Sequence, residues 1–172
     1  MKKVIEFAKE HHASLIQLTT HKDRPQAKRF YEKLGFTVAK EAVTEIGNGF
    51  VMDDYAHNPH KIDSMMQMAE KIRGAITYIY QPHGFAPTRM MKAEYIQAFA
   101  KNLRPSDRLL LLPIFYVGGT VAKDISSEDL ARGVLSLGKS AAVCSREDVL
   151  AQARPGESYI IFGARDESLS AF

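Results

Sequence analysis

One short polar stretch holds the side chains best suited to chemistry. It spans residues 53–59, with the sequence DDYAHNP, and combines two carboxylates, an imidazole and an amide. It follows the apolar run 50–52 and precedes a helical pattern, and ligands of open α/β sheets bind beyond the carboxyl ends of strands. The stretch therefore predicts a ligand-binding loop. The alternative is a plain helix start, in which Asn58 caps the helix, Pro59 takes its first position and the rest is solvated.

Three further loops follow predicted strands and carry polar or glycine-rich sequence. They are residues 81–89 (QPHGFAPTR), 116–120 (YVGGT) and 163–166 (GARD). Because the carboxyl ends of parallel strands meet at one edge of a sheet, four such loops would assemble a single site.

The elements that would position these loops alternate between strand and helix from residue 50 onward. Strands are predicted over residues 50–52, 75–80, 108–115, 141–144 and 159–162, and helices over 59–73, 88–103, 126–137 and 147–153. Ser126, followed by Asp129, is typical of a helix cap. The nearly continuous apolar strands indicate a sheet that is covered on both faces. We therefore expect an α/β fold with a doubly wound, mostly parallel, Rossmann-like sheet.

A second, smaller unit precedes this domain. Residues 1–40 are predicted to form helix, strand, helix and strand, and we expect domains over residues 1–45 and 46–172. Residues 26–36 (QAKRFYEKLGF) resemble the closing motif of the GCN5-related N-acetyltransferases. The resemblance implies that Tyr31 lies near the sulfur of acetyl-CoA as a general acid. The glycine-rich turn that would hold the pyrophosphate is not found, so a packing stripe of Phe30, Tyr31 and Leu34 is the preferred interpretation.

The larger domain resembles the C-terminal domain of the Mur ligases. The resemblance rests on residues 54–59 (DYAHNP), on residues 81–83 (QPH) followed by Arg89, and on residues 163–166 (GARD). It implies an ATP-dependent amide ligase for peptidoglycan precursors, in which ATP with Mg²⁺ phosphorylates a carboxylate and an amine attacks the acyl phosphate. Such a domain contacts the nucleotide and positions the incoming amino acid or peptide.

The resemblance also implies roles for single residues. By this resemblance, four residues would contact the nucleotide: Asp54, Tyr55, His57 and Asn58. His83 and Arg89 would form the catalytic pair, facing the incoming carboxylate or the acyl phosphate. A planar guanidinium suits that task because it pairs with a carboxylate or phosphate through two hydrogen bonds.

Two departures from the family pattern limit this interpretation. Gly84 and Pro87 stand where the alanine-adding members carry arginine, which puts alanine as the acceptor in doubt. The UDP-sugar domain and the central ATPase domain are not found in the sequence. We therefore expect no complete reaction from this chain alone, with the missing ligase domains in trans as candidate partners. An acetyltransferase fragment or a non-catalytic binding module are the alternatives.

One formal motif is rejected. Residues 133–140 (GVLSLGKS) match the P-loop letters, yet a helix precedes them and a strand follows, which reverses the order that phosphate binding requires. Gly138 is better interpreted as the residue that ends the helix. Cys144, at the end of the next predicted strand, is interpreted as a core residue.

The composition excludes several classes of protein. The 172 residues carry a net charge of +3 without a basic stripe among aromatics, so we expect no nucleic-acid partner. A single cysteine permits no disulfide within the chain and fits a cytoplasmic location. The longest apolar run is too short for a membrane span, and the N-terminus does not resemble a signal peptide. No set of residues predicts a metal site of the chain's own.

Overall fold

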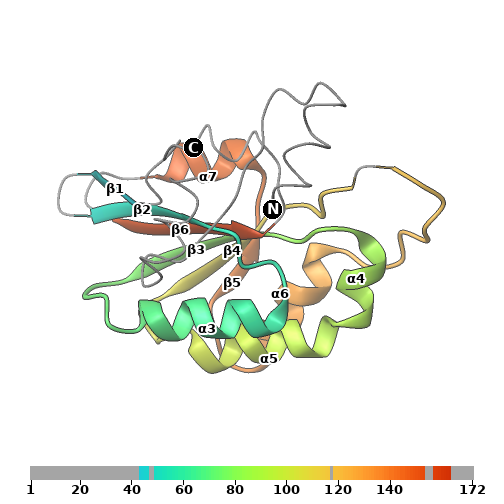
Figure 1. Ribbon diagram of the computed structural model, residues 1–172, viewed down its shortest axis with the longest axis horizontal. Helices are drawn as coiled ribbons and strands as arrows, with labels where there is room; N and C mark the ends of the chain where they lie inside the picture. The colour runs from blue at the N-terminus through green and yellow to red at the C-terminus, as the bar shows by residue number, and fades with distance from the viewer. Residues whose placement is uncertain (1–42, 47–48, 117, 154–156, 164–172) are drawn as a thin grey trace, which may run out of the picture. The chain divides into compact units, whose positions relative to one another are not determined.

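The computed structural model of the protein describes residues 43–46, 49–116, 118–153 and 157–163 (Figure 1). The chain divides into two compact units, residues 1–40 and 41–172, and all described residues belong to the second. The predicted elements of residues 1–40, Tyr31 among them, and the loop residues 164–166 lie outside the described residues.

A six-stranded sheet forms the centre of this unit, in the strand order β1-β2-β6-β3-β4-β5. The strands are β1 (Val43–Ile46), β2 (Gly49–Asp54), β3 (Ile76–Gln81), β4 (Arg108–Leu111), β5 (Ala141–Val143) and β6 (Ser158–Gly163). All neighbours pair in parallel except β1, which is antiparallel to β2. The predicted α/β fold with a mostly parallel sheet is confirmed.

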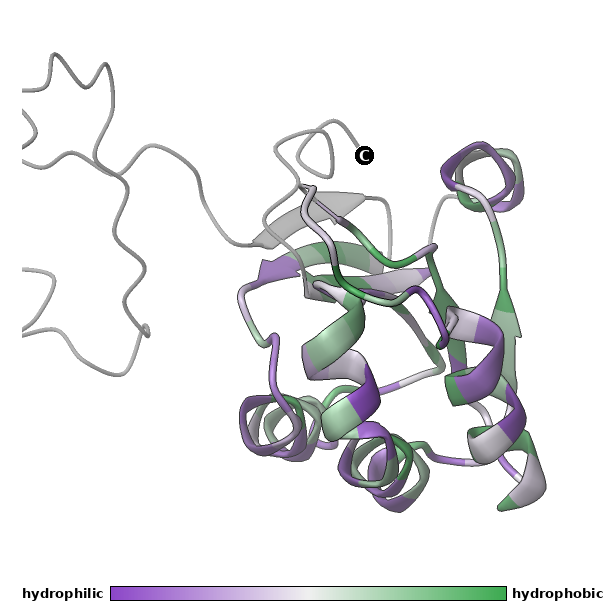
Figure 2. Cartoon of the chain, turned by 90° about the vertical axis from the view of Figure 1, so that its right-hand side faces the viewer, coloured by the Kyte–Doolittle hydropathy of each residue, from purple (hydrophilic) through white to green (hydrophobic). Residues whose placement is uncertain are grey.

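Helices cover both faces of the sheet. They are α3 (Pro59–Ala69), α4 (Phe85–Met90), α5 (Lys92–Asn102), α6 (Ser127–Ser136) and α7 (Arg146–Gln152). In Figure 1, α3 and α5 lie below the sheet and α7 lies above it. The larger core cluster joins the sheet to α3, α5 and α6, whereas a smaller one, with Ile79, Leu112 and Val149, lies on the α7 side. Coloured by hydropathy, the helices carry both hydrophobic and hydrophilic residues, as helices that cover a sheet do (Figure 2).

The observed elements differ from the predicted ones in three places. The strand β1 was missed, because four residues beside a glycine turn carry little periodicity. The predicted helix 88–103 is two helices that meet at Met91, whose φ of −106° and ψ of 23° depart from helical geometry. The predicted strand 108–115 ends at Leu111, since Pro113 has no N–H to donate to a ladder. Farther on, Phe115 forms an isolated parallel bridge with His83.

A buried ion pair organises the amino end of the sheet. The fully buried Asp107 carboxylate accepts hydrogen bonds from the Arg104 guanidinium at 2.8 Å and from the Ile76 backbone N–H at 3.0 Å. Arg104 also donates to the carbonyls of Ile72 and Gly74, at 2.7 and 2.8 Å. Burial acts to raise the pKa of Asp107, but the hydrogen bonds from Arg104 and Ile76 outweigh it and hold that pKa below its usual value.

None of the helices in the described part of the chain has the length and apolar character to cross a membrane.

Candidate functional site

The loops after β2, β3 and β4 meet at the carboxyl edge of the sheet. Asp54 on β2, Phe162 on β6 and Tyr80 on β3 lie level with one another in register. Since neighbouring strands are about 4.8 Å apart, Asp54 and Tyr80 are separated by about 10 Å. The Leu112 N–H, just past β4, donates to the Tyr80 carbonyl at 2.9 Å. The prediction that these three loops emerge at one edge is confirmed, and the fourth, beyond Gly163, lies outside the described residues.

The loop between β2 and α3 is shaped by its own polar side chains. Asp54 Oδ1 accepts a hydrogen bond from the Ala56 N–H at 2.7 Å, which closes a tight turn. Asn58 Oδ1 accepts from the Lys61 N–H at 3.0 Å and caps α3, and Pro59 takes the first helical position. The capping role considered for Asn58 is confirmed, so its side-chain oxygen is already occupied within the fold.

Two rings and a cation form the outward side of this loop. The rings of Tyr55 and His57 lie 4.6 Å apart between centroids, and His57 Nδ1 is 3.0 Å from the Tyr55 carbonyl. The Lys61 ammonium lies 5.5 Å from the centroid of the Tyr55 ring. Since both rings are half-buried, the loop presents partly exposed aromatic surface beside a positive charge.

Two buried tyrosines hold the main chain of this loop. The Tyr95 hydroxyl, from α5, donates to the His57 carbonyl at 2.8 Å, and the Tyr80 hydroxyl, from β3, reaches the same oxygen at 3.5 Å. Burial raises the pKa of both phenols, and that of Tyr80 well above its usual value, so both stay protonated as donors. Sequence reasoning missed this anchor, although a buried tyrosine hydroxyl usually signals a polar partner nearby.

The second loop is fixed by backbone hydrogen bonds to the third. The Gly84 N–H donates to the Phe115 carbonyl at 2.9 Å, and the Phe115 N–H donates to the Pro82 carbonyl at 2.8 Å. Gly84, directly before α4, has a φ of 76°, a conformation that favours glycine. The exposed His83 therefore extends from a rigid turn, with its ring centroid 5.8 Å from that of Phe115.

Arg89 lies at the end of α4 and pairs with the segment that follows the third loop. Its guanidinium forms an ion pair with Asp124 and a 3.5 Å hydrogen bond to the Ala122 carbonyl. The neighbouring Lys123 ammonium lies 5.8 Å from the centroid of the Phe85 ring and 5.3 Å from that of Tyr116. Sequence reasoning missed these partners because they lie more than thirty residues from Arg89 along the chain.

The glycine that opens the fourth loop is required by close packing. Gly163 has a φ of 116°, and a Cβ at this position would lie 2.2 Å from the Gln81 carbonyl oxygen. The remaining residues of that motif, 164–166, lie outside the described part of the chain.

The interpretations of the P-loop-like residues and of Cys144 agree with the observed geometry. The P-loop-like residues 133–140 form the end of α6 and the turn into β5, where Gly138 has a φ of 75° and the Lys139 ammonium donates to the Leu103 carbonyl at 2.6 Å. Cys144 is half-buried, and burial raises the pKa of its thiol, which disfavours the thiolate. Within the described ranges, no group of three His, Cys, Asp or Glu side chains could hold a metal ion.

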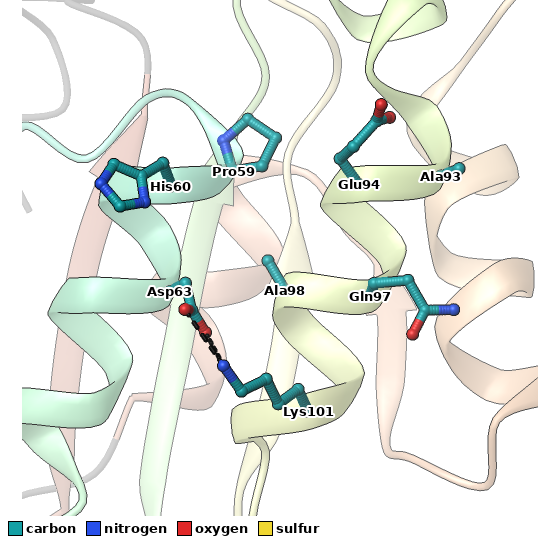
Figure 3. A pocket seen from close by; sticks show the side chains of 8 residues that line it. All are labelled: Pro59, His60, Asp63, Ala93, Glu94, Gln97, Ala98 and Lys101. Atoms are coloured by element: carbon teal, nitrogen blue, oxygen red, sulfur yellow. Dashed lines mark hydrogen bonds and ion pairs between the residues drawn. The ribbon is translucent and has the colours of Figure 1, made fainter.

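The surface of the described part is hollowed between α3 and α5 and at the carboxyl edge of the sheet. A shallow groove of about 600 Å³ runs between α3 and α5, where the Lys101 ammonium donates to the Asp63 carboxylate at 3.0 Å (Figure 3). Hydrogen bonds from Asn102 and Lys101 hold the pKa of Asp63 below its usual value. An open hollow of about 350 Å³ lies at the carboxyl edge of the sheet, between Gln81, the loop after β4 and the start of α7.

Known proteins resemble both parts of the chain. Residues 40–165 match the family model described as Mur ligase, glutamate ligase domain, and residues 1–36 match the acetyltransferase (GNAT) family. A UDP-N-acetylmuramate–L-alanine ligase of Synechococcus sp. (strain RCC307) is 27% identical over 132 residues, covering 67% of this chain and 27% of that protein. The enzyme of the same name from Lacticaseibacillus casei (strain BL23) is 28% identical over 160 residues, covering 90% of this chain and 35% of that protein.

Solved structures agree on the fold. The UDP-N-acetylmuramate–alanine ligase of Thermotoga maritima has a TM-score of 0.52 at 20% identity, over 83% of this chain and 34% of that one. A UDP-N-acetylmuramoyl-L-alanyl-D-glutamate–2,6-diaminopimelate ligase has a TM-score of 0.55 at 18% identity, over 80% and 31% of the two chains. This chain matches 27% and 35% of the lengths of the two curated relatives above. Since the family model matches most of the chain, this protein belongs to the Mur ligase family through its glutamate ligase domain.

Proposed function

We propose that this chain serves as the C-terminal domain of an ATP-dependent carboxylate–amine ligase acting on peptidoglycan precursors. In this role it contacts the nucleotide and positions the acceptor amino acid or peptide, without completing the reaction alone. The observation that carries the proposal is the loop of residues 55–58, held at the carboxyl edge of the sheet by Tyr95 and capped onto α3 by Asn58. A loop held in this way is preorganised for a ligand.

Asp54 is the proposed contact to the ribose. One of its oxygens accepts the Ala56 N–H, and a carboxylate has further lone pairs with which to accept a hydroxyl hydrogen. The Tyr55 and His57 rings and the Lys61 ammonium flank the same loop. Together, the Asp54 carboxylate and these rings suit a nucleoside, which has both hydroxyl groups and an aromatic base.

The phosphates and Mg²⁺ do not fit the described residues. The only P-loop-like letters form a helix end, and the described part offers no group of three acidic or imidazole ligands. We therefore assign the phosphates and the metal to other ligase domains, in the same protein or in trans. Bound there, ATP would supply the phosphoryl group that activates the carboxylate.

His83 and Arg89 are proposed to face the activated carboxylate and the incoming substrate. Arg89 is paired with Asp124, and both side chains are substantially exposed, at 42% and 56%. Exposed ion pairs contribute less than about 1 kcal/mol, so a substrate carboxylate or phosphate can take the place of Asp124 at small cost. A cytoplasmic location is part of the proposal, because the substrates and ATP belong to that compartment.

Nucleotide-induced thermal stabilisation tests this function. We expect ATP to raise the Tm of the parent chain, because a ligand at tenfold excess over its Kd stabilises the folded state by about 1.4 kcal/mol. Asp54→Ala should abolish the shift, whereas Asp53→Ala, at the exposed neighbouring position, should keep it. An unchanged Tm of the parent at 10 mM ATP (about ten times a millimolar Kd) contradicts the proposal.

Acetyl-CoA binding by the N-terminal residues is a second candidate, favoured by the family match over residues 1–36. Titration of the parent and of Tyr31→Phe with acetyl-CoA tests it by calorimetry. Heat of binding in the parent that falls in the variant supports this function, and its absence in the parent ends it. If neither ATP nor acetyl-CoA binds, a non-catalytic binding module is the alternative that is left.

A further inference from the structure

One exposed segment, which we call the strap, lies between the loop after β4 and α6. It spans residues 118–124, all of which are exposed. The chain is fixed on both sides of it: Phe115 forms two backbone hydrogen bonds with the loop after β3, and the Ser127 hydroxyl donates to the Leu112 carbonyl at 2.6 Å. Among the described residues, no backbone group of the strap forms a hydrogen bond with another backbone group. Contacts with side chains therefore hold the strap in place.

Two adjacent charges of the strap face α4. Asp124 forms an ion pair with Arg89, whose guanidinium also donates to the Ala122 carbonyl at 3.5 Å. The Lys123 ammonium lies 5.8 Å from the centroid of the Phe85 ring, which is one helical turn before Arg89. Contacts of both kinds are weak where water reaches them, so the strap can leave α4 at small cost.

Asp124 occupies the group that an anionic substrate needs. A guanidinium pairs in the same way with any carboxylate or phosphate, and Asp124 already supplies a carboxylate to Arg89. An anion that approached another edge of the guanidinium would still meet the negative charge of Asp124. Because both side chains are substantially exposed, dissolved anions reach the pair and compete with Asp124 for Arg89.

We propose that Asp124 is a built-in competitor that lowers the affinity of Arg89 for anions, and that the strap moves off α4 when an anion binds. This inference rests on the proposed function, in which Arg89 faces the activated carboxylate or its phosphate, and it adds a residue that sets the affinity of that site. Since Lys123 and Asp124 are neighbours on one backbone, displacement of Asp124 also draws the Lys123 ammonium away from the Phe85 ring.

Titration with inorganic phosphate measures the competition. The full chain is titrated at constant pH and ionic strength, and NMR follows the Arg89 side-chain N–H. Asp124→Asn should bind phosphate about three- to sixfold more tightly than the parent, because an exposed ion pair is formed in most molecules and only the unpaired fraction binds. An unchanged affinity in Asp124→Asn overturns the proposal, as does the absence of phosphate binding in both proteins.

A second exposed carboxylate controls for net charge. Glu94→Gln removes the same charge from an exposed position in the first turn of α5. It should change the phosphate affinity by less than about twofold, since salt screens charges that do not contact the site. A gain in Glu94→Gln equal to that in Asp124→Asn would make the effect one of overall charge and overturn the role of Asp124.

The ring of Tyr116 reports the movement of the strap. Its hydroxyl is 3.5 Å from the Val121 N–H, and its ring centroid is 5.3 Å from the Lys123 ammonium. Saturating phosphate should move the Tyr116 ring signals of the parent toward those of Asp124→Asn without phosphate. Ring signals that stay unchanged overturn the movement of the strap.

Arg89→Ala shows whether the anion binds at the proposed place. This variant should lose the phosphate-induced change at Tyr116, and a change that persists would place the anion elsewhere and overturn the proposal. None of these titrations contains ATP. A failure of the nucleotide contact therefore appears in the Tm measurement alone, and a failure of the competition appears in the phosphate titrations alone.

Discussion

The two ends of the same parallel sheet use their polar residues in opposite ways. At the amino end, Asp107 is buried and receives hydrogen bonds from Arg104 and from the backbone of Ile76. At the carboxyl end, Arg89 pairs at the surface with Asp124, and the buried Gln81 oxygen has no hydrogen-bond partner among the described residues. Burial with complete pairing gives stability, whereas an exposed pair such as that of Arg89 leaves its groups accessible to a ligand.

The loop of residues 55–58 lies between these extremes. The Tyr95 hydroxyl holds the main chain of this loop, yet the side chains of His57 and of the preceding Asp54 remain partly exposed. A rigid backbone that presents accessible side chains is the arrangement that a binding site needs. Substitutions at the two ends of the sheet and at the tyrosine that holds this loop should therefore affect stability by different amounts.

The largest effect is expected at the amino end. Asp107→Ala leaves the Arg104 guanidinium without its buried partner and the Ile76 N–H without an acceptor, which should cost about 3–5 kcal/mol of unfolding free energy. Urea unfolding followed by circular dichroism measures this loss. Asp124→Ala, at an exposed ion pair, is the control and should cost less than about 1 kcal/mol. Equal losses for the two variants would remove the distinction between the two ends.

A smaller effect is expected under the nucleotide loop. Tyr95→Phe removes the 2.8 Å hydrogen bond to the His57 carbonyl, which should cost about 1 kcal/mol and speed amide hydrogen exchange over residues 55–58. The matched control is Tyr80→Phe, whose hydroxyl is 3.5 Å from the same oxygen and should contribute less. Exchange that is unchanged in Tyr95→Phe would show that the tyrosine does not hold the loop.

The smallest effect on stability is expected at the catalytic candidate. Arg89→Ala breaks an exposed pair with Asp124 and should change the unfolding free energy by less than about 1 kcal/mol. Urea unfolding of this variant, compared with Arg104→Ala, checks the difference between an exposed and a partly buried guanidinium. A loss for Arg89→Ala as large as that for Arg104→Ala would mean that Arg89 is a structural residue.

Much of the fold was predictable because its signals are local. The apolar strands and the mostly parallel sheet follow from patterns a few residues long. The Ser126–Asp129 cap is another such signal, confirmed by a 2.9 Å hydrogen bond from the Ser126 N–H to Asp129 Oδ2. The break between α4 and α5 was not predicted, because Met91 is an ordinary helix former and only packing places a turn there.

For the candidate site, the sequence by itself determined which loops carry polar chemistry and that they follow parallel strands. Spacing along the chain is sufficient for that, since strand direction fixes the edge at which each loop emerges. Only the tertiary structure decided the partners, because they lie far apart in sequence: Tyr95 beneath His57, Asp124 beside Arg89, and Pro113 beside Gln81. Hydrogen bonds of this kind depend on distances between elements, which no local pattern specifies.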